Sequence, residues 1–213
     1  MLKEPAVFFK EFLTSFQTTG SVIPSSRWAA EALTTRLRVT KGRQRILEVG
    51  PGTGSVTKRI LEDMHDSDVL TICEINPRMM KALKDSLLKN ADFILHQSRI
   101  TFIEGPIQAL PEPAMFDTII CAIPFNNLPL NVVEEIFMKL KRVSHNDSYL
   151  SFFEYLGLRE INMVISLQQR RRRMKQIEDF FDRLNSQHPT TRKIVWRNFT
   201  PINIYTVQLK RAA

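Results

Sequence analysis

The chain has 213 residues, of which 43% are hydrophobic, 24% charged and 9% aromatic. This composition excludes a disordered, collagen-like or disulfide-dense chain, and the length is that of one domain with at most a small appendage. The net charge of +8 is uneven, because residues 1–155 carry 18 basic and 18 acidic side chains, whereas residues 156–213 carry 12 basic and 4 acidic ones. The excess of positive charge in the last part of the chain predicts contact with an anionic partner, either nucleic acid or a membrane surface.

The two cysteines, Cys73 and Cys121, lie in apolar runs without metal-ligand spacing, which predicts buried thiols and implies a reducing compartment. Charged residues interrupt the N-terminal apolar segment, so it does not resemble a secretory signal. No uncharged apolar stretch is long enough to span a membrane, which takes about 18 residues. None of the four histidines stands in a motif, and we expect no metal site.

From residue 45 onward, short apolar runs alternate with segments of helical periodicity. In chain order, the expected elements are a strand at Arg45–Val49, a helix at Gly54–Met64, a strand at Val69–Ile75, a helix at Pro77–Leu88, strands at Ile100–Glu104 and Phe116–Ile123, a helix at Leu130–Val143, a strand at Tyr149–Tyr155, a long basic helix at Arg159–Leu184, and strands at Arg192–Asn198 and Asn203–Leu209. This alternation predicts an α/β fold with a mostly parallel sheet covered by helices on both faces. The short link before the last strand predicts an antiparallel pair that leaves one reversed strand at the edge of the sheet.

A glycine-rich turn follows the first expected strand, with the sequence Glu48-Val49-Gly50-Pro51-Gly52-Thr53-Gly54. Glycines at this spacing allow a tight turn and the close approach of a ligand to the backbone. The spacing differs from that of dinucleotide folds and of phosphate loops, and no Lys-Ser or Lys-Thr pair follows, which disfavours nucleoside triphosphate hydrolysis.

An acidic residue, Glu74, stands at the end of the second expected strand, 20 residues after Gly54. A carboxylate at this place can accept hydrogen bonds from both hydroxyls of a bound ribose. Ligands of such sheets bind beyond the carboxyl ends of the strands, which is where both motifs fall.

The runs LEVGPGTG and CEINPRM resemble those of class I S-adenosylmethionine-dependent methyltransferases over roughly residues 20–210. The resemblance implies a Rossmann-like sheet of seven strands whose last hairpin supplies the antiparallel strand, with S-adenosylmethionine as cofactor. It implies that Glu48, Gly50, Gly52 and Gly54 surround the methionine part of the cofactor, that Glu74 holds the ribose and that Ile75 packs on the adenine. Pro106 stands where these enzymes usually carry Asp, so we expect the adenine to be read by backbone groups near Ile107, by Gln108, or less specifically, and Ala122 to complete the cofactor site.

After the fourth strand comes Ala122-Ile123-Pro124-Phe125-Asn126-Asn127. It departs from the polar-Pro-Pro-aromatic motif of adenine methylases and resembles the corresponding run of bacterial phospholipid and ornithine-lipid N-methyltransferases. The resemblance implies catalytic roles for Asn126 and Phe125. Glu154 and Tyr155 end the fifth strand, where they could orient a cationic amine, although a structural role remains open.

The N-terminal segment places Phe8, Phe9, Phe12 and Phe16 at helical spacing, and the run GSVIPSS that follows is also similar to the start of those lipid methyltransferases. This resemblance implies an amphipathic helix and cofactor lid in residues 1–40, followed by the methyltransferase domain in residues 41–213. A Phe-rich stripe flanked by Lys suits insertion into the interface of a bilayer, whereas docking on the protein's own core is the alternative.

Four consecutive arginines, Arg170, Arg171, Arg172 and Arg173, lie in the long basic helix and would attract either anionic lipid or RNA phosphates. The resemblance favours lipid. We therefore expect a cytoplasmic enzyme, peripheral on the inner face of the membrane, that methylates the amine of a lipid head group such as phosphatidylethanolamine. The alternatives are a ribosomal RNA adenine N6-methyltransferase and a non-enzymatic adaptor that has lost cofactor binding.

Overall fold

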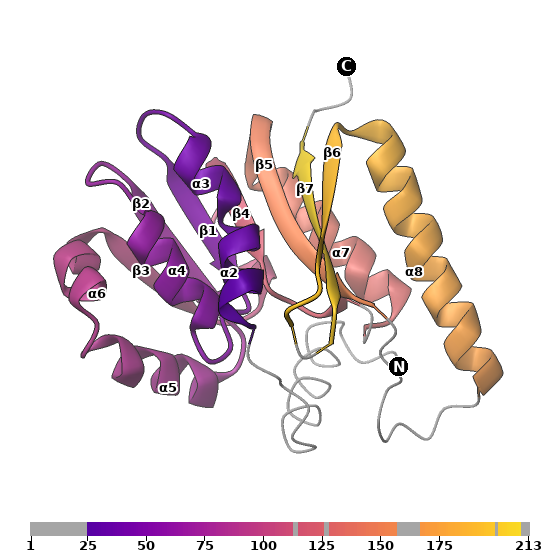
Figure 1. The fold of residues 1–213 in the computed structure, drawn as a ribbon, viewed down its shortest axis with the longest axis horizontal. Coiled ribbons are helices and arrows are strands. Elements are labelled where there is room, and N and C mark those ends of the chain that lie inside the picture. Colours follow the sequence, from indigo (N-terminus) through magenta and orange to yellow (C-terminus); the bar gives the residue numbers. More distant parts are fainter. Residues whose placement is uncertain (1–24, 113–114, 126–127, 157–166, 199, 210–213) are drawn as a thin grey trace.

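The computed structural model describes residues 25–112, 115–125, 128–156, 167–198 and 200–209 (Figure 1). Their strands are β1 (Arg45–Val49), β2 (Val69–Glu74), β3 (Ile100–Glu104), β4 (Phe116–Cys121), β5 (Ser144–Tyr155), β6 (Thr190–Val195) and β7 (Ile202–Gln208). Their helices are α2 (Arg27–Leu33), α3 (Thr35–Val39), α4 (Ser55–Asp63), α5 (Pro77–Leu87), α6 (Ala91–His96), α7 (Leu130–Arg142) and α8 (Leu167–Gln187), with short 3₁₀ turns η1 (Gln97–Arg99) and η2 (Ile107–Ala109).

The strands form one seven-stranded sheet in the order β3-β2-β1-β4-β5-β7-β6, in which β7 runs antiparallel to both of its neighbours. The α/β fold class is therefore confirmed, but the expected edge position of the reversed strand is wrong. Strand β7 is almost continuously buried, which suits an interior position, whereas β6 is largely exposed and carries Arg192 and Lys193. A short, charged strand is the kind that protects a sheet edge from pairing with another chain.

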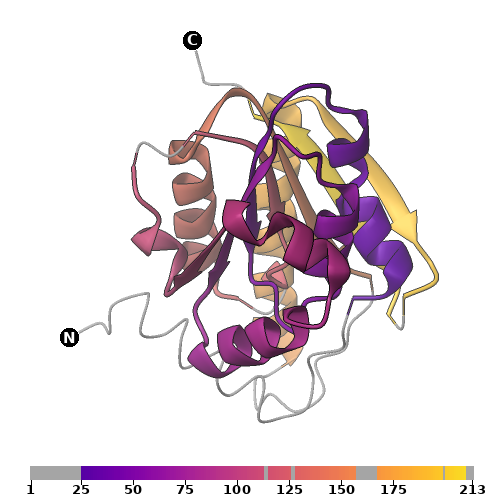
Figure 2. The same cartoon turned by 90° about the vertical axis from the view of Figure 1, so that its left-hand side faces the viewer.

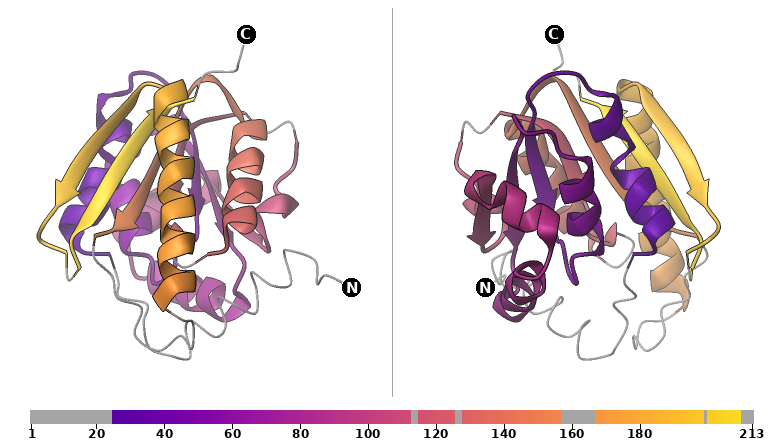
Figure 3. Two further views of the ribbon diagram at one scale, coloured as in Figure 1. Left: turned by 90° about the vertical axis from the view of Figure 1, so that its right-hand side faces the viewer. Right: turned by 60° about the vertical axis from the view of Figure 1, so that its left-hand side comes forward.

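Strands β1, β2, β4, β5 and β6 all point the same way and end at one edge of the sheet, which we call the carboxyl edge (lower edge in Figure 1). Helices α2 to α6 cover one face of the sheet and α7 and α8 cover the other, as the views in Figure 2 and Figure 3 show. Each face buries its own apolar cluster: Ile60 of α4 and Leu83 of α5 belong to one, and Phe137 of α7 and Phe181 of α8 to the other.

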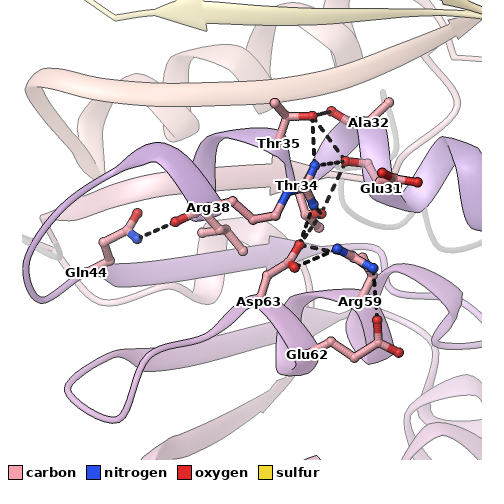
Figure 4. Close-up of polar contacts among 10 residues, drawn as sticks. Glu31, Ala32, Thr34, Thr35, Arg38, Gln44, Arg59, Glu62 and Asp63 are labelled. Carbon is pink, nitrogen blue, oxygen red and sulfur yellow. Dashed lines mark hydrogen bonds and ion pairs between the residues drawn. The ribbon is translucent and has the colours of Figure 1, made fainter.

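Two helices that the periodicity did not indicate, α2 and α3, precede β1. Ser26 caps α2 by accepting a hydrogen bond from the Ala29 N–H. Figure 4 shows how α3 and α4 are tied together: Asp63 accepts hydrogen bonds from Thr34 and Arg38, both at 2.7 Å, and from Arg59 at 2.8 Å. Asp63 is nearly buried, with 5% of its side chain exposed, so this network is shielded from solvent on one side. Residues 25–40 thus pack on the same core as the rest of the domain.

Helix α6, between α5 and β3, was not predicted either, and the bounds of the other elements differ from the expected ones mainly at the ends. Strand β5 begins five residues earlier than expected, at Ser144, and β6 ends at Val195, before Trp196. Helix α8 runs on to Gln187, and residues 157–166, over which we expected it to begin, lie outside the described residues. Hydrophobic periodicity defines the interior of a helix or strand better than its ends, which fray by one or two residues.

Candidate active site

The glycine loop joins the end of β1 to α4 at the carboxyl edge. Gly50, Gly52 and Gly54 have φ of 71°, 55° and 83°, the left-handed region that side chains with a β-carbon disfavour. A β-carbon at Gly50 would lie 2.9 Å from Cγ1 of Ile123, and one at Gly54 would lie 2.5 Å from Cδ1 of Leu83. These two glycines are therefore required by packing.

Gly52 differs from its neighbours, since a β-carbon there would meet nothing within 4 Å. The loop thus exposes a bare stretch of backbone to open space, as a site must where a ligand approaches the main chain closely. Packing within the chain therefore does not explain why residue 52 is a glycine. The reason is either its backbone conformation or a ligand that lies against it.

Glu48 lies one residue before the end of β1 and is completely buried, and neither of its carboxylate oxygens has a hydrogen-bond partner in the part of the chain that the structure describes. Burial raises its pKa from 4.5 to about 8, and the nearby Thr57 hydroxyl offsets only part of that rise. The Thr57 hydroxyl is itself buried without a hydrogen bond of acceptable geometry. A buried carboxyl group and a buried hydroxyl left without partners beside a bare loop suit a ligand that brings its own donors, such as an amino group.

Glu74 at the end of β2 is brought to the glycine loop, as the resemblance implies. Its Oε2 accepts a hydrogen bond from the Gly52 N–H at 3.4 Å, and its Oε1 accepts one from the Asn76 N–H at 2.9 Å. Burial raises the pKa of Glu74, and these backbone donors act in the opposite direction. The carboxylate is thereby held in a fixed orientation next to the exposed backbone of Gly52.

The remaining residues expected around the cofactor sit at the same edge with different exposures. Ile75 follows Glu74 and packs partly against the core, and Ala122 is partly buried and donates its N–H to the Val49 carbonyl at 2.8 Å. Ile107 lies in η2 and is 3% exposed, so its side chain belongs to the core. Any contact of a ligand with this residue would therefore involve its main chain, and the cofactor roles of all three residues stay predictions.

Phe125, for which the resemblance implies a catalytic role, has its ring in the core at the end of β4. The side chain is completely buried, with ring centroids 5.0 Å from Phe137, 5.9 Å from Phe152 and 6.0 Å from Phe181. Phe125 therefore supports the end of β4 from within the core. Asn126, the other residue of this run with an expected catalytic role, lies outside the described residues.

Glu154 and Tyr155 both end β5 at the carboxyl edge, but successive residues of a strand point to opposite faces. Glu154 accepts a hydrogen bond from the Tyr205 hydroxyl at 3.2 Å on the face of α7 and α8. Tyr155 packs on the other face, with its ring 5.1 Å from that of Phe153, and burial raises its pKa. The two side chains thus cannot orient one amine from the same direction.

Strand β7 supplies residues beside Glu154 that sequence reasoning missed. Burial, and next the neighbouring charge of Glu154, raise the pKa of Tyr205 to about 12, which keeps its hydroxyl protonated as a donor. Asn203 pairs with Glu154 across the sheet and accepts a hydrogen bond from Nε of Arg192 at 2.9 Å. Only the register of β5 with β7 brings these groups together, and no local sequence signal reveals that register.

The outlying features of the expected site lie elsewhere or outside the described residues. The described residues do not include Phe8, Phe9, Phe12 and Phe16, nor the side chains of Arg170 and Arg171. Of the remaining arginines of this run, Arg172 is exposed and Arg173 is half-buried. Within the described parts of the chain, no helix is long and apolar enough to cross a bilayer, and no group of His, Cys, Asp and Glu side chains is placed to hold a metal ion. Cys73 and Cys121 are buried free thiols, and burial raises the pKa of each to about 12.

A cavity of about 500 Å³ lies between α3 and strands β5, β6 and β7, lined by residues such as Arg36, Tyr149 and Gln208. It opens near the start of β6 and the end of β7, which is the edge of the sheet opposite to the glycine loop. It therefore lies apart from the candidate active site.

Comparison with known proteins places a family described as "Methyltransferase domain" on residues 46–147. The chain is similar to an ornithine lipid N-methyltransferase of Singulisphaera acidiphila, with 22% identity over 67% of this chain and 73% of the relative. A ubiquinone/menaquinone biosynthesis C-methyltransferase of Coxiella burnetii is 32% identical over 48% of this chain and 39% of that enzyme. A ribosomal RNA small subunit methyltransferase A of a Synechococcus strain is 30% identical over 38% of this chain and 28% of its own length. The chain thus spans well under half of the last two relatives.

Solved structures share the fold over nearly the whole chain. The O-methyltransferase TomG of Streptomyces achromogenes, in complex with SAM, has a TM-score of 0.61 at 13% identity and covers 98% of this chain and 91% of its own. An O-methyltransferase of Bacillus cereus, in complex with SAH, has a TM-score of 0.62 at 13% identity, with 98% and 92% covered. At this identity the likeness establishes the fold.

Proposed function

Because the chain contains a class I S-adenosylmethionine-dependent methyltransferase domain, we propose that it methylates the amine of a lipid head group at a membrane surface. When bound, S-adenosylmethionine would supply an electrophilic methyl group, whose bond to the sulfonium sulfur would break as the bond to the amine nitrogen forms. The chain's own residues contribute by binding and orienting the reactants, and positioning supplies most of the rate of such a displacement.

The residues around the glycine loop hold the cofactor. The Glu48 carboxyl group and the Thr57 hydroxyl, which have no hydrogen-bond partner among the described residues, would receive the amino end of the methionine part. The Glu74 carboxylate, fixed by the Gly52 and Asn76 N–H groups, accepts hydrogen bonds from the ribose hydroxyls. Ile75 and the main chain at Ile107 bound the adenine, and Ala122 borders the cofactor at the end of β4.

The acceptor amine must lose a proton before its nitrogen can attack, because an ammonium group has no lone pair. Glu154 is the carboxylate at the end of β5, and the Tyr205 hydroxyl donates a hydrogen bond to it at 3.2 Å. We assign to Glu154 the role of attracting the ammonium form and receiving its proton, directly or through water. Asn126 would accept a hydrogen bond from the same nitrogen, and Tyr155 would shape the other side of the strand end.

The observation that supports a lipid acceptor most directly is the likeness to an ornithine lipid N-methyltransferase, which extends over 67% of this chain. The charge distribution agrees with it, because the excess of positive charge lies in residues 156–213 and leaves the cofactor-binding part neutral. A basic segment of this kind attracts anionic head groups. The cofactor-binding part is neutral, so its net charge does not repel the cofactor.

The second candidate acceptor is an adenine amino group in ribosomal RNA. The observation that favours it is the 30% identity over 82 residues with a ribosomal RNA methyltransferase. RNA phosphates would bind the same basic residues. The missing polar-Pro-Pro-aromatic motif at residues 122–125 counts against it.

The experiment that separates these acceptors is transfer of a radiolabelled methyl group from S-adenosylmethionine, by the purified full chain, to bacterial lipid extract and to ribosomal RNA in parallel. We expect label in amine-bearing lipids that co-migrates with N-methylated standards. At a limiting concentration of S-adenosylmethionine, Glu74→Ala should strongly reduce all labelling, whereas Lys81→Ala, an exposed change in a surface ion pair of α5, should preserve it. Label found only in RNA, or only on a carbon of a quinone ring, would overturn the lipid-amine proposal.

A further inference from the structure

Both tryptophans of the chain are exposed at the carboxyl edge. Trp196 follows the end of β6 with 70% of its surface accessible, and Trp28 in the first turn of α2 is 36% accessible. The chain contains no other tryptophan. Exposed aromatic side chains that lie near one another are informative, because exposed apolar patches mark interaction sites, whereas a single exposed one needs no explanation.

The segments that carry the two tryptophans meet at the carboxyl edge, although they are far apart in sequence. The Ser26 N–H donates to Oδ1 of Asn198 at 3.0 Å, which joins the start of α2 to the segment after β6. Arg197 lies over the Trp28 ring at 5.5 Å from its centroid, and Arg27 lies over it at 4.6 Å. We call the surface formed by Arg27, Trp28, Trp196 and Arg197 the tryptophan edge.

The tryptophan edge carries positive charge that no acidic side chain of the described residues neutralises. Within the described residues, neither Arg27 nor Arg197 forms an ion pair, and the sequence contains no acidic residue after Asp182. Helix α8 also begins at the carboxyl edge, with Arg170–Arg173 within its first seven residues and no acidic side chain in its first turn (Figure 1). Arginines at the positive end of a helix dipole oppose helix stability, so this placement suits a surface that meets anions.

We propose that the tryptophan edge is the docking surface of this protein on an anionic phospholipid bilayer, an inference that rests on the proposed lipid substrate. Indole rings favour the interface of a bilayer, where the ring lies among the upper acyl chains and the N–H remains hydrated. Guanidinium groups stacked on such rings keep their charge for lipid phosphates. Docking here presents the glycine loop and the end of β5 to the membrane, because all of them lie at the same edge of the sheet.

The test uses the two tryptophans as intrinsic probes in the full chain, since every fluorescence change then reports on the tryptophan edge itself. We expect a blue shift of emission with vesicles of phosphatidylglycerol and phosphatidylcholine in equal parts, and quenching when the acyl chains are brominated. The single-tryptophan proteins Trp28→Phe and Trp196→Phe should each retain the quenching. Vesicle binding without any quenching would overturn the proposal, since the chain would then dock through another surface.

Charge variants test the arginines against a matched control. Arg27→Gln with Arg197→Gln should weaken vesicle binding about 30-fold, because each basic residue near an anionic surface contributes about a factor of five. Lys41→Gln with Arg43→Gln removes the same charge from exposed positions at the opposite edge and should change binding by less than about twofold, since charges beyond a Debye length are screened. Equal losses in the two double variants would refute a local role of the tryptophan edge.

Two further readouts keep this inference separate from the function on which it rests. Methyl transfer to phosphatidylethanolamine in detergent micelles should survive Arg27→Gln with Arg197→Gln, because micelles need no docking. Wild-type protein that docks through the tryptophan edge but labels no lipid would overturn the proposed function and leave the docking surface standing. A blue shift with ribosomal RNA and none with vesicles would overturn the docking proposal in favour of stacking on bases.

Discussion

Gly52 and Gly42 offer a matched pair of substitutions that separates backbone strain from ligand contact. Both have a left-handed conformation, with φ of 55° and 87°, and a β-carbon at either would meet nothing within 4 Å. Gly52 lies in the glycine loop beside Glu74, whereas Gly42 lies between α3 and β1, away from the carboxyl edge. Gly52→Ala and Gly42→Ala therefore impose the same strain and differ only in what the added methyl group meets when the cofactor binds.

The left-handed conformation costs about 1–2 kcal/mol for a residue with a β-carbon. In a chain of this length, each kcal/mol lowers Tm by about 2–4 °C, so we expect both variants to lose about 2–8 °C without cofactor. Inserting a methyl group into a filled space costs about 1–3 kcal/mol, which corresponds to roughly 5- to 150-fold weaker binding. We expect this loss of S-adenosylmethionine affinity in Gly52→Ala alone.

Thermal unfolding without ligand measures the first effect, and calorimetric titration with S-adenosylmethionine measures the second. Binding that is equally tight in the two variants would refute the argument that the open space at Gly52 is cofactor space. A Tm loss confined to one variant would instead refute the premise that the two glycines are strained alike.

Three other substitutions test the carboxyl groups and the aromatic cluster. Glu48 takes up a proton on folding between pH 4.5 and about 8, because folding raises its pKa from the first value to the second. Its contribution to the free energy of unfolding is therefore lost as pH rises between these values, by about 1.4 kcal/mol per pH unit. Glu48→Gln should flatten this pH dependence of unfolding, measured without cofactor. Glu74→Ala removes charge-assisted hydrogen bonds worth about 1.5–3 kcal/mol, so calorimetry should show S-adenosylmethionine binding weakened about 10- to 150-fold, and unchanged affinity would contradict the ribose contact. Phe125→Ala leaves a cavity among packed rings and should cost about 3–5 kcal/mol in denaturant titration, whereas a loss below about 1 kcal/mol would show that the ring is not part of the core.

The sequence was sufficient for the features that depend on local pattern. Alternation of apolar runs with helical periodicity predicted all seven strands of the described sheet, because most of them are apolar segments between turns. The contact between Glu74 and Gly52 also followed, since β1 and β2 are parallel neighbours whose ends meet at one edge. The spacing of a motif constrains geometry well when the fold connects its parts by one βαβ unit.

The missed features depend on contacts that are distant in sequence or on signals that were present but not used. Ser26 before Arg27-Trp28-Ala29-Ala30 is a recognisable N-cap of α2, and period-two alternation alone separates Glu154 from Tyr155. By contrast, β7 lies inside the sheet, where it is almost completely buried, and its register with β5 places Tyr205 beside Glu154. No local pattern specifies such pairing, which the packing of the whole sheet decides.

The position of the tryptophan edge bears on why a parallel sheet suits chemistry at a membrane. Every strand that runs parallel to β1 ends at the carboxyl edge, so cofactor-binding loops and the end of β5 must gather there whatever the acceptor is. The reversed strand β7 makes β6 end at the same edge, which is what brings Trp196 and Arg197 beside Trp28. If β6 instead lay between β5 and β7 and paired antiparallel with β5, it would run the other way and carry Trp196 and Arg197 to the opposite edge. The strand order β5-β7-β6 therefore allows one surface to hold both the reacting groups and the residues that would dock them on lipid.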